Sequence, residues 1–310
     1  MSESKPFQSP RYGTKLGHRI FHLLLRWFGP APAYALLVFV VSYYVFVLKT
    51  PRKSAYYYLK NRFPQDSTFK RLFRTYRYIY QFGLVLIDQA AMGILGRKSF
   101  QIDFPGWEEL YNLSTRKKGM VIITSHFGNW KTAMAAVDDL AVPVNFLIHL
   151  EEHMKGRHYF DLAGIRDKIK VIDPLGFMGG LVEAKKVLEN GECVAIMGDR
   201  AWGSRTQTCD FLGKPAPFPV SPYYLMAASG ADLVVFFTVR TGKLAFKIDF
   251  VQLNRDGRQG QEQSAKGTVR HFLPKYVQTL EGFVQQYPYM WFNIFDFWKN
   301  QKTGFEEEKI

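Results

Sequence analysis

The stretch MVIIT at residues 120–124 runs directly into SHFGNW at residues 125–130. Five consecutive apolar and β-branched residues are typical of a buried strand, and a helix pattern starts near Trp130. Gly128 lies between the two and allows a close backbone approach. The stretch therefore predicts a strand that turns tightly into a helix and holds His126 at its carboxyl end.

Six further apolar stretches of strand length alternate with segments of helical length. The pattern predicts an α/β fold with a mixed, largely parallel central sheet flanked by helices. A polar, glycine-rich stretch at 256–267 predicts a mobile loop before a helix that runs to about residue 286. The remaining predicted strands are 100–104, 142–148, 170–172, 193–197, 233–238 and 244–251, and the predicted helices are 130–140, 154–163, 180–189 and 221–228.

The first 49 residues predict an N-terminal hydrophobic helical membrane anchor. Basic residues at helical spacing share one face of residues 15–27, and apolar residues cover the opposite face. Residues 27–48 carry no charge, but Pro30 and Pro32 leave roughly 16 apolar residues, which is short for a span. A span and an interfacial helix both stay open, beside a buried helix of a soluble domain. We therefore divide the chain into a membrane-anchoring unit, 1–49, and one domain, 50–310. The domain begins with helices up to about residue 95, and Thr50 and Pro51 are expected to be the cap and first turn of the first of them.

The composition narrows the class of partner. Lys and Arg exceed Asp and Glu by 14, and aromatic residues make up 16% of the chain. Such a positive field attracts anionic lipids, acidic carrier proteins, phosphates or nucleic acid. We expect membrane lipids and no nucleic acid, because the chain has an apolar anchor and no nucleic-acid-binding motif. We expect no metal, since the two cysteines lack ligand spacing and Leu150 stands where a metalloprotease motif needs Glu.

His126 and Asp199 both follow predicted strands, where ligands of α/β sheets tend to bind. A histidine in this position can remove a proton from a hydroxyl or an amine. Taken alone, the segment fits a structural capping histidine better.

Several segments together carry a resemblance to a known family. They are SHFGNW at 125–130, MGDR at 197–200, FLGKPAPFPVSP at 211–222, YPYMWFNIFDFW at 287–298 and the apolar N-terminus. In this order they resemble the lysophospholipid acyltransferase superfamily, in particular the branch of the bacterial lipid A biosynthesis late acyltransferases.

The resemblance implies a membrane-associated acyltransferase. It would move a fatty acyl group from acyl carrier protein or a coenzyme A thioester to a hydroxyl or amine of a lipid-like acceptor, with His126 as general base. No cofactor beyond this co-substrate is implied, and the implied location is the cytoplasmic face of the bacterial inner membrane.

One position departs from the family motif, which places an acid five residues after the histidine. Lys131 stands there instead, and a lysine cannot stabilise an imidazolium as a carboxylate does. Asp199 is our preferred substitute, by the logic of a catalytic triad, and Asp138 and Asp139 are alternatives. The departure also leaves open a second hypothesis, a non-catalytic lipid-binding protein that retains the acyltransferase fold.

The predicted site extends to residues that line the substrate or its phosphates. Arg200 has the chemistry to hold a phosphate, as do Lys214 and Arg205 further along. Phe211 and the proline-rich stretch after it either wall an acyl groove or shape a helix entrance, and residues 291–298 predict an aromatic closing helix used mainly in packing. The predicted substrate-binding residues are Ser125, Gly128, Asn129, Trp130, Lys131, Glu151, Arg200 and Phe211.

Overall fold

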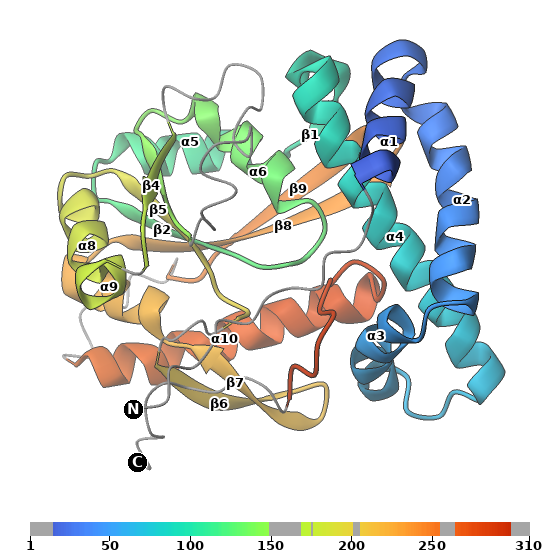
Figure 1. Cartoon of the computed structure of the whole chain (residues 1–310). Helices are drawn as coiled ribbons and strands as arrows, with labels where there is room; N and C mark the ends of the chain where they lie inside the picture. The colour runs from blue at the N-terminus through green and yellow to red at the C-terminus, as the bar shows by residue number, and fades with distance from the viewer. Residues whose placement is uncertain (1–14, 149–168, 175, 201–204, 255–263, 299–310) are drawn as a thin grey trace.

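A seven-stranded sheet forms the centre of the molecule, with helices on both faces and along one edge (Figure 1). The computed structural model describes residues 15–148, 169–174, 176–200, 205–254 and 264–298. The predicted α/β class and the largely parallel sheet are confirmed.

The strand order places two strands that are far apart along the chain, Met120–Thr124 and Cys193–Met197, side by side at the centre of the sheet. The order is β1-β9-β8-β2-β5-β3-β4, and neighbours are parallel except for the antiparallel pair β8 and β9. The strands are β1 (Gln101–Asp103), β2 (Met120–Thr124), β3 (Val144–Leu147), β4 (Ile169–Ile172), β5 (Cys193–Met197), β8 (Asp232–Gly242) and β9 (Ala245–Gln252).

The central strands are buried on both faces, which explains why they read as continuous apolar runs. In β2, Val121 and Ile123 join one core cluster, while Met120 and Ile122 join the other. One core lies under α8 (Leu181–Glu189), α9 (Ser221–Ser229) and α10 (Ala265–Gln286). The second lies under α5 (Trp107–Thr115) and α6 (Trp130–Ala136).

A two-stranded hairpin packs against α10. The sequence pattern predicted no strand in this part of the chain. Strand β6 (Thr206–Phe211) pairs antiparallel with β7 (Lys214–Pro219). The sequence pattern did not predict β7 because this strand contains three prolines. They occupy every second position, so their missing N–H groups all face away from β6 and no ladder hydrogen bond is lost. The three prolines are Pro215, Pro217 and Pro219.

Four helices at the N-terminus form a layer along the β1–β9 edge (Figure 1). They are α1 (Lys15–Phe28), α2 (Pro30–Phe46), α3 (Lys49–Arg62) and α4 (Thr68–Leu95). The predicted amphipathic helix is confirmed as α1, and Pro30 begins α2. One face of α2 is buried with α4, and α3 leaves α2 at 86°. By length and composition α4 is apolar enough to cross a bilayer, and the bent α2–α3 pair passes the same test if counted as one span.

Two local predictions were wrong, and two others fall wholly or largely outside the described residues. The helix predicted to start with Thr50 as its cap begins at Lys49. Residues 291–298 form no helix, because Phe127 and Trp291 form an antiparallel bridge. The helix predicted at 154–163 and most of the loop at 256–267 fall outside the described residues. The loop's predicted following helix is α10.

A buried ion pair fastens the helix layer to the sheet. The Nε of Arg240, on β8, donates to the Asp88 carboxylate of α4 at 2.7 Å, and the hydroxyl of Tyr34, on α2, donates to the same carboxylate. The Asp88 side chain is fully buried and that of Arg240 is 13% exposed. Burial raises the pKa of Asp88, although Arg240 and Tyr34 act in the opposite direction.

Breaking this pair from one side should destabilise the protein more than removing both partners. Arg240→Met leaves a buried carboxylate without its cation, and such a loss costs about 3–5 kcal/mol. The double variant Asp88→Leu/Arg240→Met should recover most of that loss, because no uncompensated charge remains. Denaturant unfolding in detergent measures the free energy of unfolding of both variants. An Arg240→Met chain as stable as the wild type would contradict the structural role given to this pair.

Candidate active site

The sheet register brings His126 and Asp199 together. Strands β2 and β5 are parallel neighbours, with Thr124 opposite Met197 at their carboxyl ends. Each of the two residues lies two positions beyond its strand end, so an in-phase register places them opposite each other. The His126 Nδ1 and Asp199 Oδ1 atoms are 2.9 Å apart. The predicted pair is therefore in hydrogen-bond contact, while its catalytic role remains a prediction.

Three hydrogen bonds hold the Asp199 carboxylate. Besides the imidazole, the backbone N–H of His126 donates to Oδ2 at 2.9 Å, and the indole Nε1–H of Trp291 donates to the same oxygen at 3.0 Å. Burial by itself would raise the pKa of Asp199, but the charge and hydrogen bonds of His126, together with the charge of Arg200, lower it to about 2. An ionised carboxylate only accepts, so the facing Nδ1 must carry the imidazole hydrogen.

His126 is placed to act as a neutral base. Burial lowers its pKa, and Arg200 lowers it further, against the opposing effect of Asp199. A quarter of the side chain is exposed, so the imidazole is accessible. With Nδ1–H committed to Asp199, the lone pair on Nε2 is free to accept a proton from a hydroxyl or amine.

The closing segment near residue 291 fixes the loop that carries His126. The N–H of Phe292 donates to the His126 carbonyl at 2.8 Å, and the N–H of Gly128 donates to the Met290 carbonyl at 2.7 Å. Gly128 has φ +60°, and a Cβ there would lie 1.6 Å from the carbonyl oxygen of Thr238. Only glycine fits this position.

Arg200 follows Asp199 and binds the same closing segment. Its Nη2 donates to the Phe292 carbonyl at 2.6 Å, and its guanidinium lies over the Phe295 ring, 5.0 Å from the centroid. These contacts hold its positive charge near His126. Its predicted contact with a phosphate remains untested.

The other predicted residues of the motif surround this pair. The buried Ser125 hydroxyl has no hydrogen-bond partner among the described residues. Asn129 is fully buried, and its Oδ1 accepts from the Nε2 of Gln89, on α4, at 3.2 Å. Trp130 begins α6, and the Lys131 ammonium lies 5.9 Å from its ring centroid. Burial lowers the pKa of Lys131 to about 8.

Other residues predicted for the site are Phe211, Glu151 and the alternative acid Asp139. Phe211 is fully buried and packs edge-on against Trp291, with ring centroids 5.1 Å apart. It thereby supports the ring that holds Asp199, and its contact with an acyl chain stays a prediction. Glu151 lies outside the described residues, as do His149 and His153, the two histidines around Leu150 that lack the metalloprotease pattern. Asp139 pairs with Arg97, so it is not the partner of His126.

Three further residues were predicted from the sequence: Lys214, Asp138 and Arg205. Lys214 donates to the Asn61 side chain at 2.6 Å, which ties the β6–β7 hairpin to α3. Asp138 is partly buried in the short turn after α6, whereas the carboxylate bonded to the His126 Nδ1 is that of Asp199. Arg205 is exposed, and its contact with a phosphate stays a prediction, as it does for Lys214 and Arg200.

Sequence reasoning missed two residues that hold the site. Trp291 was assigned to packing, yet it donates to Asp199. Gln89 carried no signal at all, because a glutamine on a long helix gives no indication of its tertiary partner. The cluster of buried aromatic residues around Trp291 was visible as the stretch YPYMWFNIFDFW, but its backbone pairing with the His126 loop was not.

Removing the positive charge at residue 200 should raise the pKa of His126. Arg200→Gln keeps an amide donor for the Phe292 carbonyl but deletes the cation that disfavours imidazolium. The neutral base would then form only at higher pH. Diethyl pyrocarbonate modifies neutral imidazole, and mass spectrometry of the His126 peptide across pH reports the midpoint. An unchanged midpoint would contradict the electrostatic role of Arg200.

The comparisons with known proteins point to one family. The family model described as bacterial lipid A biosynthesis acyltransferase matches residues 1–300. A search of curated proteins found no match. The match covers the helix layer, the sheet, the His126 loop and the closing segment alike. The chain therefore belongs to the bacterial lipid A biosynthesis acyltransferase family, within the lysophospholipid acyltransferase superfamily.

Proposed function

We propose that this chain transfers a fatty acyl group from an acyl thioester, carried by acyl carrier protein or coenzyme A, to a hydroxyl or amine of a lipid-like acceptor. The family supports an acyltransferase of lipid A biosynthesis. The observation that carries the proposal is the Nδ1–Oδ1 contact of 2.9 Å between His126 and Asp199. It gives the histidine a carboxylate partner although Lys131 replaces the acid of the family motif.

The chemistry follows from the free Nε2 of His126. The neutral imidazole removes the proton of the acceptor hydroxyl as that oxygen attacks the thioester carbonyl carbon. The new C–O bond forms, the C–S bond breaks, and the imidazolium returns its proton to the leaving sulfur. Asp199 stabilises the imidazolium and keeps the ring in the Nδ1–H tautomer. No additional cofactor is needed in this scheme.

Variants of the pair test this proposal against the non-catalytic alternative. His126→Ala should abolish acyl transfer, and Asp199→Asn should lower kcat by about 10²–10⁴-fold, because the tautomer is no longer enforced. Lys131→Glu should give no gain, since Asp199 already occupies Nδ1. The assay follows a labelled acyl group from acyl carrier protein to a lipid A precursor. An inactive parent chain that gains activity with Lys131→Glu would support the lipid-binding alternative.

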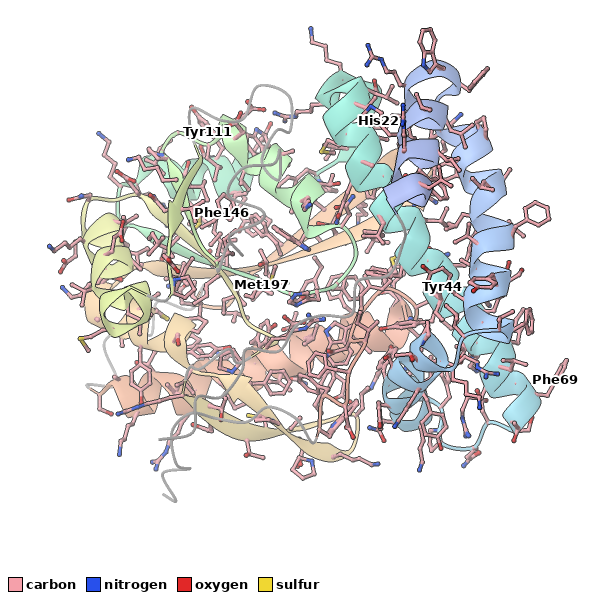
Figure 2. All side chains as sticks on the ribbon, viewed as in Figure 1. His22, Tyr44, Phe69, Tyr111, Phe146 and Met197 are labelled. Atoms are coloured by element: carbon pink, nitrogen blue, oxygen red, sulfur yellow. The ribbon has the colours of Figure 1, made fainter. Side chains whose placement is uncertain are left out.

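We further propose that the enzyme works on a membrane surface, at the cytoplasmic face of the bacterial inner membrane, where acyl carrier protein and coenzyme A thioesters are found. Several large apolar side chains of α1 are exposed, whereas Leu25, Phe21 and Leu24 pack into the cluster shared with α2 and α4. Large exposed apolar side chains continue along α2 to the start of α4, and Phe69 points away from the sheet (Figure 2). They include Leu16, Leu23, Trp27, Phe28, Phe39, Tyr43, Phe46, Phe69 and Phe73.

The packing of α2 favours a helix that lies on the membrane over one that crosses it. Its 17 residues span roughly 25 Å, less than the ~30 Å hydrocarbon core. Leu37 and Val41 are buried in the cluster that also holds Leu84 and Ile87 of α4. Helix α4 in turn bonds to the sheet and to the His126 loop, so neither helix can leave the domain without breaking these contacts.

Labelling from the two sides of the membrane distinguishes these arrangements. Arg26→Cys and Lys53→Cys flank the apolar run, in a chain whose Cys209 is replaced by serine. For a surface helix, an impermeant maleimide should label both positions in inside-out vesicles and neither in right-side-out ones. Labelling of the two positions from opposite sides would establish a span.

A vesicle assay tests the same surface. Phe39→Glu/Phe46→Glu should weaken binding to phosphatidylglycerol vesicles at least tenfold, because carboxylates replace apolar contacts with an anionic bilayer. Tyr111→Glu is the matched control, since Tyr111 is an exposed aromatic residue of α5, far from α2 (Figure 2). Equal binding by all three proteins would contradict the assignment of this face.

A further inference from the structure

The motif loop has a second anchor, which comes from helix α4. Asn129 lies between Gly128 and the first residue of α6, and its side chain is fully buried. Its Oδ1 accepts from the Gln89 Nε2 at 3.2 Å, while its Nδ2 has no partner among the described residues. A buried amide normally has its polar atoms bonded. Within the part of the chain that the structure describes, Gln89 makes the only side-chain hydrogen bond recorded for Asn129.

Asp88, the residue before Gln89, holds α4 against the sheet. Asp88 accepts from the Arg240 Nε at 2.7 Å, which fixes α4 against β8. The same strand carries Thr238, whose carbonyl faces Gly128 and leaves no room for a Cβ there. Helix α4 and the His126 loop are therefore both positioned by one short stretch of β8.

We propose that Gln89 is a positioning residue of the active site, which holds Asn129, and through it the His126 loop, from helix α4. This inference rests on the proposed acyl transfer. The closing segment fixes the loop on the side of His126, through Phe292, and at Gly128, through Met290. Gln89 fixes the far side, where the loop enters α6. Without it, the loop keeps its backbone bonds but loses the constraint on its exit.

A loop that lacks this side-chain hydrogen bond should place the imidazole less accurately. A displacement of about 1 Å from a productive geometry is worth up to 10²-fold in rate. Gln89→Leu, which keeps the bulk without the amide, should therefore lower kcat about 10- to 100-fold and leave the KM for the acyl donor within about twofold. Gln89→Asn keeps the amide but is one methylene too short, so it should show the same loss. Gln89→Glu should retain most activity, because an Asn129 amide turned over can donate to its carboxylate.

The matched control is Gln81→Leu, the same replacement two turns earlier on α4, which should leave kcat within about twofold. Modification of His126 by diethyl pyrocarbonate supplies a readout that needs no substrate. Gln89→Leu and Gln89→Asn should change its rate or its pH midpoint, while Gln81→Leu and Gln89→Glu should follow the wild type.

Two results would overturn the inference. One is a Gln89→Leu chain with wild-type kcat and wild-type His126 modification. The other is equal loss in Gln89→Leu and Gln81→Leu, which indicates a general effect on α4. Failure of the proposed function looks different, because the wild type would then show no acyl transfer or His126→Ala would retain it, and the modification experiment would still report on the Gln89 anchor.

Discussion

The carboxylate of Asp199 is the group on which the rest of the site depends. It is fully buried, and an ionised carboxylate in that position is costly unless donors surround it. The three donors come from two parts of the structure: the imidazole and the backbone N–H of His126, beyond β2, and the indole of Trp291, in the closing segment. Strand β5 thus supplies the acceptor that ties the His126 loop to the C-terminal segment.

This constraint explains why residues 291–298 do not form the helix that their sequence predicted. The indole of Trp291 must reach Asp199, while the backbone of the same segment pairs with the His126 loop. In a helix the carbonyls of Trp291 and Phe292 would accept from N–H groups within the segment, whereas here they accept from Tyr78 and Arg200. Tertiary hydrogen bonds overrode a local preference, and no periodicity in the sequence carries that information.

Much of the pairing of His126 with Asp199 was nonetheless predictable from the sequence. MVIIT-Ser-His and CVAIM-Gly-Asp place His126 and Asp199 two residues beyond strands of equal length, and both strands read as buried. The sequence could not show that these strands are neighbours, because β3 and β4 come between them along the chain yet lie to one side in the sheet. Trp291 and Gln89 were beyond reach for the same reason, since their partners are 92 and 40 residues away. The β6–β7 hairpin was missed because alternate prolines mask a strand.

The structure also bears on the lysine that replaces the motif acid. A neutral imidazole has one N–H, and here Nδ1–H is committed to Asp199. A carboxylate at position 131 would find no hydrogen left on Nδ1, and if it engaged Nε2 it would occupy the atom that accepts the proton in the proposed mechanism. The lysine therefore removes no interaction that this arrangement requires. Because burial lowers the pKa of Lys131 only to about 8, the side chain stays largely cationic at neutral pH and changes the sign of the charge on the first turn of α6. The carboxylate that contacts His126 follows β5, so this contact does not depend on the residue at position 131.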